Sequence, residues 1–120
     1  ERMAEEIRKT QRIMWELLGY QTRLFRFPYG RYSEKALDVI GQNGLYAIQW
    51  DVVSGDPDPK IDADRMVHWV LSRMKPGSIV IMHANGRGRH TAKALLPIIH
   101  GLREKGYAPV TVSRLLGLER

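Results

Sequence analysis

The sequence contains no cysteine, which excludes disulfide bonds and metal sites built from thiolates. It also has no apolar run that approaches the roughly 20 residues of a membrane-spanning helix. Its first residues do not resemble a signal peptide, so any export signal is expected upstream. Internal repeats and low-complexity stretches are absent as well. What remains is a chain of 120 residues, 43% of them hydrophobic, which suits one modest domain or part of a larger one.

Acidic residues are fewer than basic ones, and the formal net charge is +6. Such an excess suits an anionic partner, for example a nucleic acid or a cell-envelope polymer. The basic residues are scattered along the chain, however, and no RNA-binding pattern with interleaved aromatic residues occurs. We therefore interpret most of this charge as solvated. A basic α/β nucleic-acid-binding domain stays an alternative that only the net charge supports.

Apolar spacing and capping residues predict five helices. The first, from Met3 to Leu17, has apolar residues at steps of three and four and ends before Gly19. The others start at capping residues, namely Ser33, Asp62, His90 or Thr91, and Ser113. We expect the third helix to bury Ala63, Val67, Val70, Leu71 and Met74, and the fourth to bury Leu95, Ile99 and Leu102. Pro97 lies within the fourth helix, so a kink or a late start is expected there.

Four strands are predicted between the helices, at residues 24–27, 45–50, 78–83 and 109–112. The third is the most distinctive, because four consecutive apolar residues precede His83, as in a strand buried on both faces. Residues 51–60 include Gly-Asp-Pro-Asp-Pro and are predicted to form a loop. Alternating helices and strands indicate parallel strands with right-handed crossovers. Since a closed barrel needs about eight strands, the chain is either a small open sheet or part of something larger.

Unusual side chains follow the predicted strands at their carboxyl ends. Residues 26–30 follow the first strand, Trp50 and Asp51 the second, and His83 the third, with Asn85 in the glycine-rich basic loop beyond it. Because the carboxyl ends of parallel strands meet at one edge, we expect a cleft there with His83 as its working residue. Each residue also has a purely structural interpretation. His83 could be a core histidine bonded to a backbone carbonyl, and Trp50 could be a core aromatic residue. Asp51 could be an ordinary loop acid, and residues 28–30 could simply form a rigid turn.

Three of these segments carry a family resemblance. Residues 26–30, R-F-P-Y-G, resemble the R-x-P-[YF]-G motif of the polysaccharide deacetylases, the NodB-homology carbohydrate esterases. Residues 50–56 occupy the place of that family's tryptophan- and aspartate-bearing motif, and residues 79–83 match its terminal strand-then-histidine motif. The resemblance covers nearly the whole chain. It implies that residues 1–120 are the C-terminal portion of a single distorted (β/α) barrel domain with parallel strands alternating with helices.

The resemblance also implies an activity and residue roles. Such enzymes remove N- or O-acetyl groups from a carbohydrate polymer. Arg26 would hold the catalytic-base aspartate, the backbone N–H of Tyr29 would help to bind the oxyanion, and His83 would protonate the leaving amine. We expect the substrate to be contacted by Pro28, Tyr29, Trp50, Asp51 and Asn85.

A divalent metal, zinc, is implied for the complete enzyme, with no ligand in this chain. The family takes its ligands from a T-F-D-D motif and an H-[ST]-x-x-x-H motif, and neither occurs here. We therefore expect this chain to be inactive alone. Its expected partners are a carbohydrate substrate and either the N-terminal half of the same domain or a symmetric oligomer, with no nucleic acid and no membrane span. The resemblance implies a cell-envelope or secreted location.

The second motif departs from the family pattern at two positions. The family's aspartate that acts on the histidine aligns with Val53, and the tryptophan expected after Asp56 is Pro57. Asp51 or Asp56 is left to orient His83. The departures keep a second function class open, a non-catalytic carbohydrate-binding or assembly fragment of the same fold.

Overall fold

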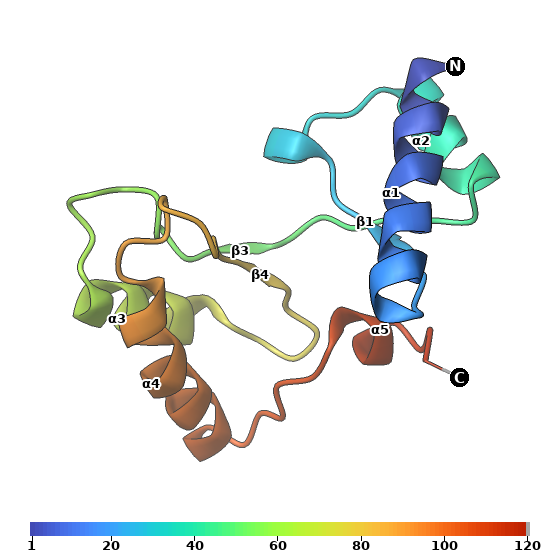
Figure 1. Ribbon diagram of the computed structural model, residues 1–120. Helices are drawn as coiled ribbons and strands as arrows, with labels where there is room; N and C mark the ends of the chain where they lie inside the picture. The colour runs from blue at the N-terminus through green and yellow to red at the C-terminus, as the bar shows by residue number, and fades with distance from the viewer. Residues whose placement is uncertain (120) are drawn as a thin grey trace. The chain divides into compact units, whose positions relative to one another are not determined.

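Two pairs of short parallel strands, each accompanied by helices, form the fold of residues 1–119, which the computed structural model describes (Figure 1). The chain divides into two units, residues 1–49 and the described residues from Trp50 onward. In both pairs the strands are parallel, as the sequence predicts. The expected α/β class is therefore confirmed.

The first unit joins two helices to one strand pair. Its elements are α1 (Arg2–Leu18), β1 (Leu24–Phe25), the 3₁₀ turn η1 (Pro28–Gly30), α2 (Glu34–Gln42) and β2 (Tyr46–Ala47). Helix α2 starts where predicted, because the Ser33 hydroxyl accepts a hydrogen bond from the Ala36 N–H at 3.2 Å. Strand β1 pairs with β2, with Leu24 opposite Tyr46. The core of this unit consists of Ile7, Phe27, Ile40 and Leu45.

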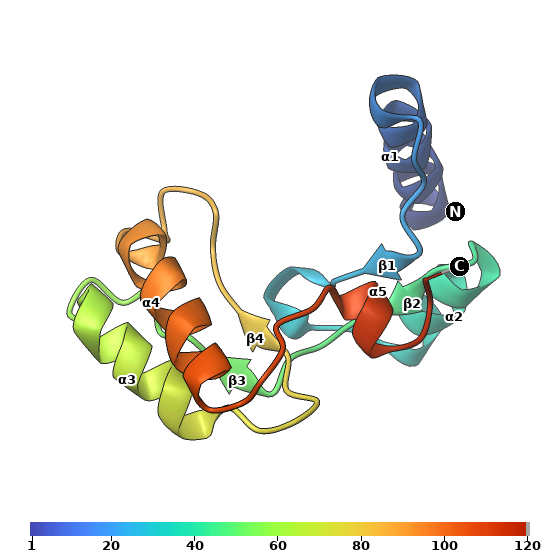
Figure 2. The same cartoon turned by 90° about the horizontal axis from the view of Figure 1, so that it is seen from below.

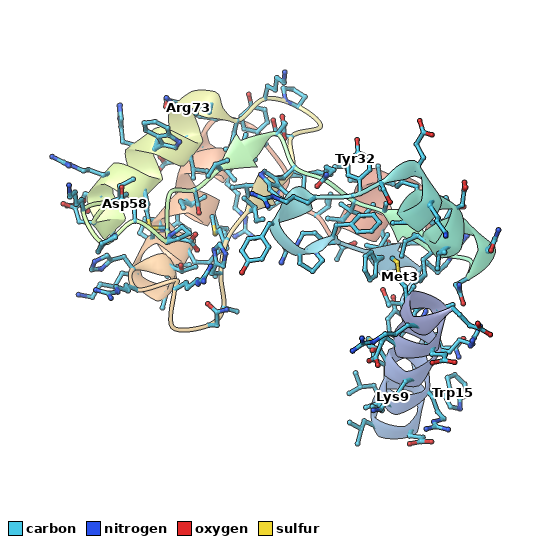
Figure 3. All side chains as sticks on the ribbon, turned by 90° about the horizontal axis from the view of Figure 1, so that it is seen from above. Met3, Lys9, Trp15, Tyr32, Asp58 and Arg73 are labelled. Atoms are coloured by element: carbon cyan, nitrogen blue, oxygen red, sulfur yellow. The ribbon has the colours of Figure 1, made fainter. Side chains whose placement is uncertain are left out.

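Helix α1 buries less of its apolar stripe than the periodicity predicts. Ile7 is its only fully buried residue, while Leu17 is 76% exposed. Trp15 also projects from the outer surface of the helix (Figure 3) and is 57% exposed. The helix and its end at Gly19 are as predicted, but the apolar side chains of its carboxyl-terminal half have no covering element in the described unit.

The second unit is built on a pair of adjacent helices. Its elements are β3 (Val52–Val53), α3 (Ala63–Arg73), β4 (Val80–Ile81), α4 (Thr91–Glu104) and α5 (Val112–Leu115). Helices α3 and α4 lie side by side (Figure 2) and bury Met66, Val70, Ala94, Ile98 and Leu102 between them. Val70 and Leu102 were predicted, but α4 buries Ala94 and Ile98 in place of Leu95 and Ile99. The same spacing fits both sets, and packing against α3 selects one of them.

Strands β1, β2 and β4 are shorter than predicted, and Ser113 lies within α5 and does not cap it. Three further elements differ from the sequence prediction. Residues 109–112 form no strand, because Thr111 caps α5 by accepting a hydrogen bond from the Arg114 N–H at 3.2 Å. Strand β3 lies in the predicted loop, since the prolines and Gly55 exclude regular structure only after Val53. Helix α4 starts at Thr91 and continues past Pro97, so the late start is wrong. No helix among residues 1–119 is long and apolar enough to cross a bilayer.

Ile98 and Leu96 allow a matched test of the α3–α4 core, because both are aliphatic residues of α4. Ile98 is 2% exposed and Leu96 is 59% exposed. We expect Ile98→Ala to lower the free energy of unfolding by about 2–5 kcal/mol, the usual cost of such a cavity. Leu96→Ala should change it by no more than about 0.5 kcal/mol. Urea unfolding followed by circular dichroism measures both, and equal losses would contradict the observed helix register.

Candidate functional site

The parallel pairing of β3 and β4 brings Asp56 and His83 together. Val52 pairs with Val80 and Val53 with Ile81, so both strands end at the same edge. Strand β3 continues through Ser54 and Gly55 to Asp56, and β4 continues through Met82 to His83. Gly55 makes the turn with a φ of 80°, a conformation that glycine adopts without strain. The carboxyl ends of two neighbouring strands thus supply a carboxylate and an imidazole.

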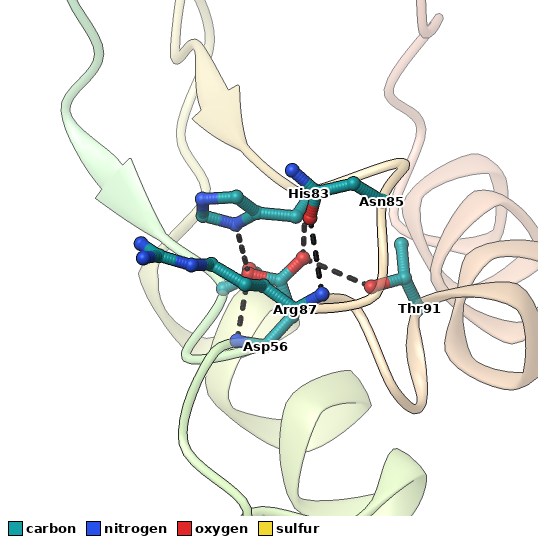
Figure 4. A network of polar contacts seen from close by, with 6 residues as sticks. Asp56, His83, Asn85, Arg87 and Thr91 are labelled. Carbon is teal, nitrogen blue, oxygen red and sulfur yellow. Dashed lines mark hydrogen bonds and ion pairs between the residues drawn. The ribbon is translucent and has the colours of Figure 1, made fainter. Parts of the chain in front are cut away.

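The Asp56 carboxylate accepts three hydrogen bonds from two elements (Figure 4). Its Oδ1 lies 2.9 Å from Nδ1 of His83, and its Oδ2 accepts from the backbone N–H of His83. Oδ2 also accepts from the hydroxyl of Thr91, the first residue of α4, at 2.9 Å. Asp56 is only 2% exposed. One buried carboxylate therefore joins the end of β4 to the start of α4.

These contacts fix the ionisation state of Asp56. Burial acts to raise the pKa of its carboxyl group, but hydrogen bonds from the His83 backbone, the His83 imidazole, Thr91 and Ser54 outweigh burial and hold the pKa below its usual value. An ionised carboxylate can only accept, so Nδ1 of His83 carries a hydrogen. No described residue hydrogen-bonds Nε2, and the His83 side chain keeps 26% of its surface exposed. The imidazole is held at one nitrogen and open at the other.

The loop after His83 folds back tightly onto the strand end. The Oδ1 of Asn85 accepts from the Arg87 N–H at 3.0 Å, and the Gly88 N–H donates to the Asn85 carbonyl at 2.9 Å. A Cβ atom at Gly88 would overlap the His83 carbonyl oxygen and the Thr91 hydroxyl. Only glycine fits there, so this residue permits the contact between Thr91 and Asp56.

Asp51 lies at the opposite end of the β3–β4 strand pair from the end that was predicted. It precedes β3, and its carboxylate accepts from the Ile79 N–H at 2.6 Å and from the Ser78 hydroxyl at 2.9 Å, before β4 begins. The Ile79 bond, followed by the Ser78 bond, lowers the pKa of Asp51. Asp51 was expected to follow the carboxyl end of a strand, on the same side of the sheet as His83. This expectation is wrong, because β3 starts after Asp51. Of the two acids left open, Asp56 is the partner of His83. Trp50, next to Asp51, is half-buried.

The motif at residues 26–30 lies in the first unit. Arg26 follows β1, and Pro28 opens the turn η1. Tyr29 has a φ of 57°, the one positive value at a non-glycine residue in the described chain, and its side chain is 76% exposed. No described residue accepts a hydrogen bond from its backbone N–H. The expected opening shared by Tyr29, Trp50 and His83 stays a prediction, because Tyr29 belongs to a different unit.

Two residues of the network were missed in the sequence. Ser54 and Thr91 both support Asp56. Ser54 lies within the motif at residues 50–56 but is given no role by it, and Thr91 belongs to no motif. The available signal for Thr91 is its position at the start of the helix that follows the His83 loop. Among residues 1–119, no three histidine, cysteine, aspartate or glutamate side chains converge on a point that could hold a metal ion. The described residues therefore do not fit a metal centre.

Comparison with known proteins gives the same assignment as the motifs. Residues 1–48 match the family model for polysaccharide deacetylase. A peptidoglycan-N-acetylglucosamine deacetylase of Bacillus cereus is 32% identical over an alignment that covers 89% of this chain and 39% of that protein. A family 4 carbohydrate esterase from Streptomyces lividans, solved with acetate, superimposes with a TM-score of 0.83 at 30% identity, covering 93% of this chain and 56% of that one. The chain belongs to the polysaccharide deacetylase family.

A third relative of the family differs in activity. A structure described as a family 4 pseudoenzyme from Bacillus anthracis superimposes with a TM-score of 0.86 at 25% identity, covering 98% of this chain and 41% of that one. In all three comparisons, this chain spans less than two thirds of its relative's length.

Asp56 gives this site a predictable response to pH. Since folding lowers its pKa, the ionised carboxylate stabilises the protein above the unfolded-state value of about 3.9 and loses that effect as pH falls through the folded-state value. We expect Asp56→Asn to lower the free energy of unfolding by about 1–3 kcal/mol at pH 7, because a buried donor loses its acceptor. The difference from wild type should shrink below about pH 4. Urea unfolding at pH 7, 5 and 3.5 measures it.

Asp64→Asn is the control, because Asp64 is exposed on α3. It should follow the wild-type pH profile. If Asp56→Asn lowers the free energy of unfolding by the same amount at pH 7 and at pH 3.5, the proposed ionised hydrogen-bond network is contradicted.

Proposed function

We propose that this chain supplies the leaving-group side of the active site in a hydrolase that removes N- or O-acetyl groups from a carbohydrate polymer. The supporting observation is the pairing of a buried carboxylate with Nδ1 of His83, which leaves Nε2 open. Membership in the polysaccharide deacetylase family agrees with this reaction. The substrate named for the Bacillus cereus relative is peptidoglycan N-acetylglucosamine, and an amino sugar in a polymer is the substrate class that we adopt.

His83 acts as the general acid in this proposal. Hydrolysis of an acetamide breaks its C–N bond, and an amine leaves readily only when its nitrogen receives a proton. The Nε2–H of a His83 imidazolium donates that proton. The Asp56 carboxylate faces the Nδ1–H on the opposite side of the ring, where it stabilises the positive charge and fixes the ring plane. Thr91 in turn holds the carboxylate, so Asp56 and Thr91 are positioning residues.

Tyr29 and Arg26 take the two roles that the family motif implies. A left-handed conformation costs a non-glycine residue about 1–3 kcal/mol, and such residues gather at functional sites. Tyr29 has this conformation, and its backbone N–H has no acceptor among the described residues. Both features support a role of this N–H in binding the oxyanion of the tetrahedral intermediate. Arg26 would hold the base aspartate, which lies outside this chain, and Pro28 would set the turn between them.

The metal of the complete enzyme would be held elsewhere. The family resemblance implies a divalent ion, zinc, but the described residues contain no converging ligand set. The steps proposed here therefore involve only the side chains and backbone of this chain. Asn85 and Trp50 remain proposed substrate contacts, while Asp51 is engaged at the other end of β4.

We also propose that this chain is one portion, the C-terminal one, of a single domain. In the described residues each sheet has only two strands, so one edge of β1 has no strand partner. A groove between α1 and β1 is lined by the apolar residues Met3, Ile7, Leu24, Phe25 and Leu45, together with polar residues of α1 and Thr22. The proposed occupant of this edge is the N-terminal half of the domain, with a second copy of the chain as the alternative.

A non-catalytic role is the second candidate. Val53 and Pro57 depart from the family pattern, and a family 4 pseudoenzyme superimposes on 98% of the chain. In that case the fragment would bind carbohydrate or support assembly without proton transfer. Replacement of His83 separates the two functions.

We expect His83→Ala in the complete protein to lower kcat for deacetylation by about 10²–10⁴-fold, the usual effect of losing a positioned general acid. His100→Ala is the matched control, because His100 is an exposed imidazole on α4. It should retain wild-type kcat. Acetate release from acetylated chitooligosaccharide and peptidoglycan measures both variants. A complete protein that releases no acetate, or a His83→Ala variant within a few-fold of wild type, would favour the non-catalytic role.

We expect the isolated 120-residue chain to associate in solution, since the β1 edge and the apolar surface of α1 are uncovered in the described unit. Light scattering should show a dimer or larger species, and the N-terminal half of the domain should convert it to a one-to-one complex. A monomer with a cooperative thermal transition would contradict the half-domain proposal.

A further inference from the structure

One long stretch of the second unit has no negative charge. Residues 65–103 contain no aspartate or glutamate, although they include all four histidines of the chain. The cationic residues of this stretch are Arg65, Arg73, Lys75, Arg87, Arg89, Lys93 and Arg103. Protein surfaces ordinarily carry positive and negative charges interspersed. A stretch that includes the His83 loop and carries only positive charges therefore needs a specific explanation.

Three of these cations belong to the segments that carry His83 and Thr91. Arg87 and Arg89 lie in the loop after His83, and Lys93 lies in the first turn of α4. All three are exposed, and none forms an ion pair with an acid in the described chain. The acid beside them, Asp56, is buried and already accepts three hydrogen bonds. The positive charge at this edge is therefore not neutralised from within the unit.

The loop presents these cations on a fixed backbone. Bonds of Asn85 to Arg87 and Gly88 close the turn, and the absence of a Cβ at Gly88 lets it pack against the His83 carbonyl. Figure 4 shows the Arg87 side chain reaching out on the side where the His83 ring lies. The side-chain nitrogen of Asn85 has no acceptor among the described residues and remains a free donor. An arginine guanidinium binds a carboxylate or phosphate through paired hydrogen bonds, and an amide N–H₂ can donate a further one.

We propose that Asn85, Arg87, Arg89 and Lys93 form an anion-recognition surface beside His83, which selects carbohydrate polymers that carry carboxylate or phosphate groups over neutral ones. This inference rests on the proposed carbohydrate substrate and specifies its class. The substrate is an acidic glycan in which the sugar with the acetyl group is at His83 and an anionic group on the same chain is at the loop. Residues 84–93 contain no tryptophan, tyrosine or phenylalanine on which bases could stack, so the surface lacks the usual means of binding single-stranded nucleic acid.

Binding can be measured independently of catalysis. Isothermal titration of the complete protein would compare a hyaluronan octasaccharide, which carries carboxylates, with a neutral N-acetylglucosamine octamer, a glycerol phosphate oligomer and a single-stranded DNA of equal charge. We expect the hyaluronan fragment to bind about tenfold more tightly than the neutral octamer at 50 mM salt. Exposed charge pairs of this kind contribute roughly 0.2–1 kcal/mol each. The preference should largely disappear at 300 mM salt, since mobile ions screen exposed charges.

Two variants with the same change in net charge locate the effect. Arg87→Gln with Arg89→Gln should reduce the preference for the carboxylated glycan to less than twofold. Arg65→Gln with Arg103→Gln removes two exposed cations from the same acid-free stretch outside the loop, and it should keep the preference. The titration with the glycerol phosphate oligomer shows whether the surface binds carboxylates only or oxyanions in general.

Three outcomes would overturn the proposal: equal affinity for neutral and acidic oligomers, equal loss in the two double variants, or tighter binding of DNA than of the glycans. Failure of the proposed deacetylation is a separate result. His83→Gln should still bind the acidic glycan preferentially, because His83 is outside the surface. A wild-type complete protein that shows this preference but releases no acetate would support the surface and contradict the proposed enzyme.

Discussion

The hydrogen bonds of the Asp56 carboxylate are the constraint on which the rest of this site depends. Burial of an ionised group is costly unless several donors compensate for the lost water. Asp56 obtains them from the backbone and ring of His83 and from Thr91. To satisfy one carboxylate, the ends of β3 and β4 and the first turn of α4 must therefore come together. Gly55 and Gly88 are needed for the same reason, because one makes the turn into Asp56 and the other lets the loop approach His83.

The sequence was most informative where local chemistry decides the structure. Ser33 and Asp62 cap helices as predicted, since an N-cap hydrogen bond depends only on residues three positions apart. It was least informative where tertiary packing decides. Residues 109–112 have a strand-like composition but pair with no strand of the described chain. The hydrogen bond by which Thr111 caps α5 therefore decides their local structure. The register of α4 depends likewise on α3, which no local pattern encodes.

The candidate site was predictable in part for the same reason. His83 could be singled out because an apolar strand that ends in an imidazole is visible in the sequence. Its partner could not, because the choice between Asp51 and Asp56 depends on where β3 begins. Asp51 precedes the strand and binds Ser78 and Ile79, whereas Asp56 follows it and reaches His83. A shift of a few residues in the start of β3 therefore decides which of Asp51 and Asp56 lies at the carboxyl end of the strand pair, beside His83, and which lies at its amino end.

The two departures from the family motif have different consequences for His83. Val52 and Ser54 are buried whereas Val53 between them is 51% exposed, as alternation along a strand requires. The side chain at position 53 therefore points away from the face on which Ser54 supports Asp56. Pro57 replaces an aromatic side chain with a smaller apolar one at an exposed position, and it changes the surface rather than the Asp56–His83 pair. Neither substitution removes a hydrogen bond of the network. A loss of catalysis in this protein would then have to originate in the residues that supply the base, the oxyanion contacts or the metal ligands, and not in the orientation of its histidine.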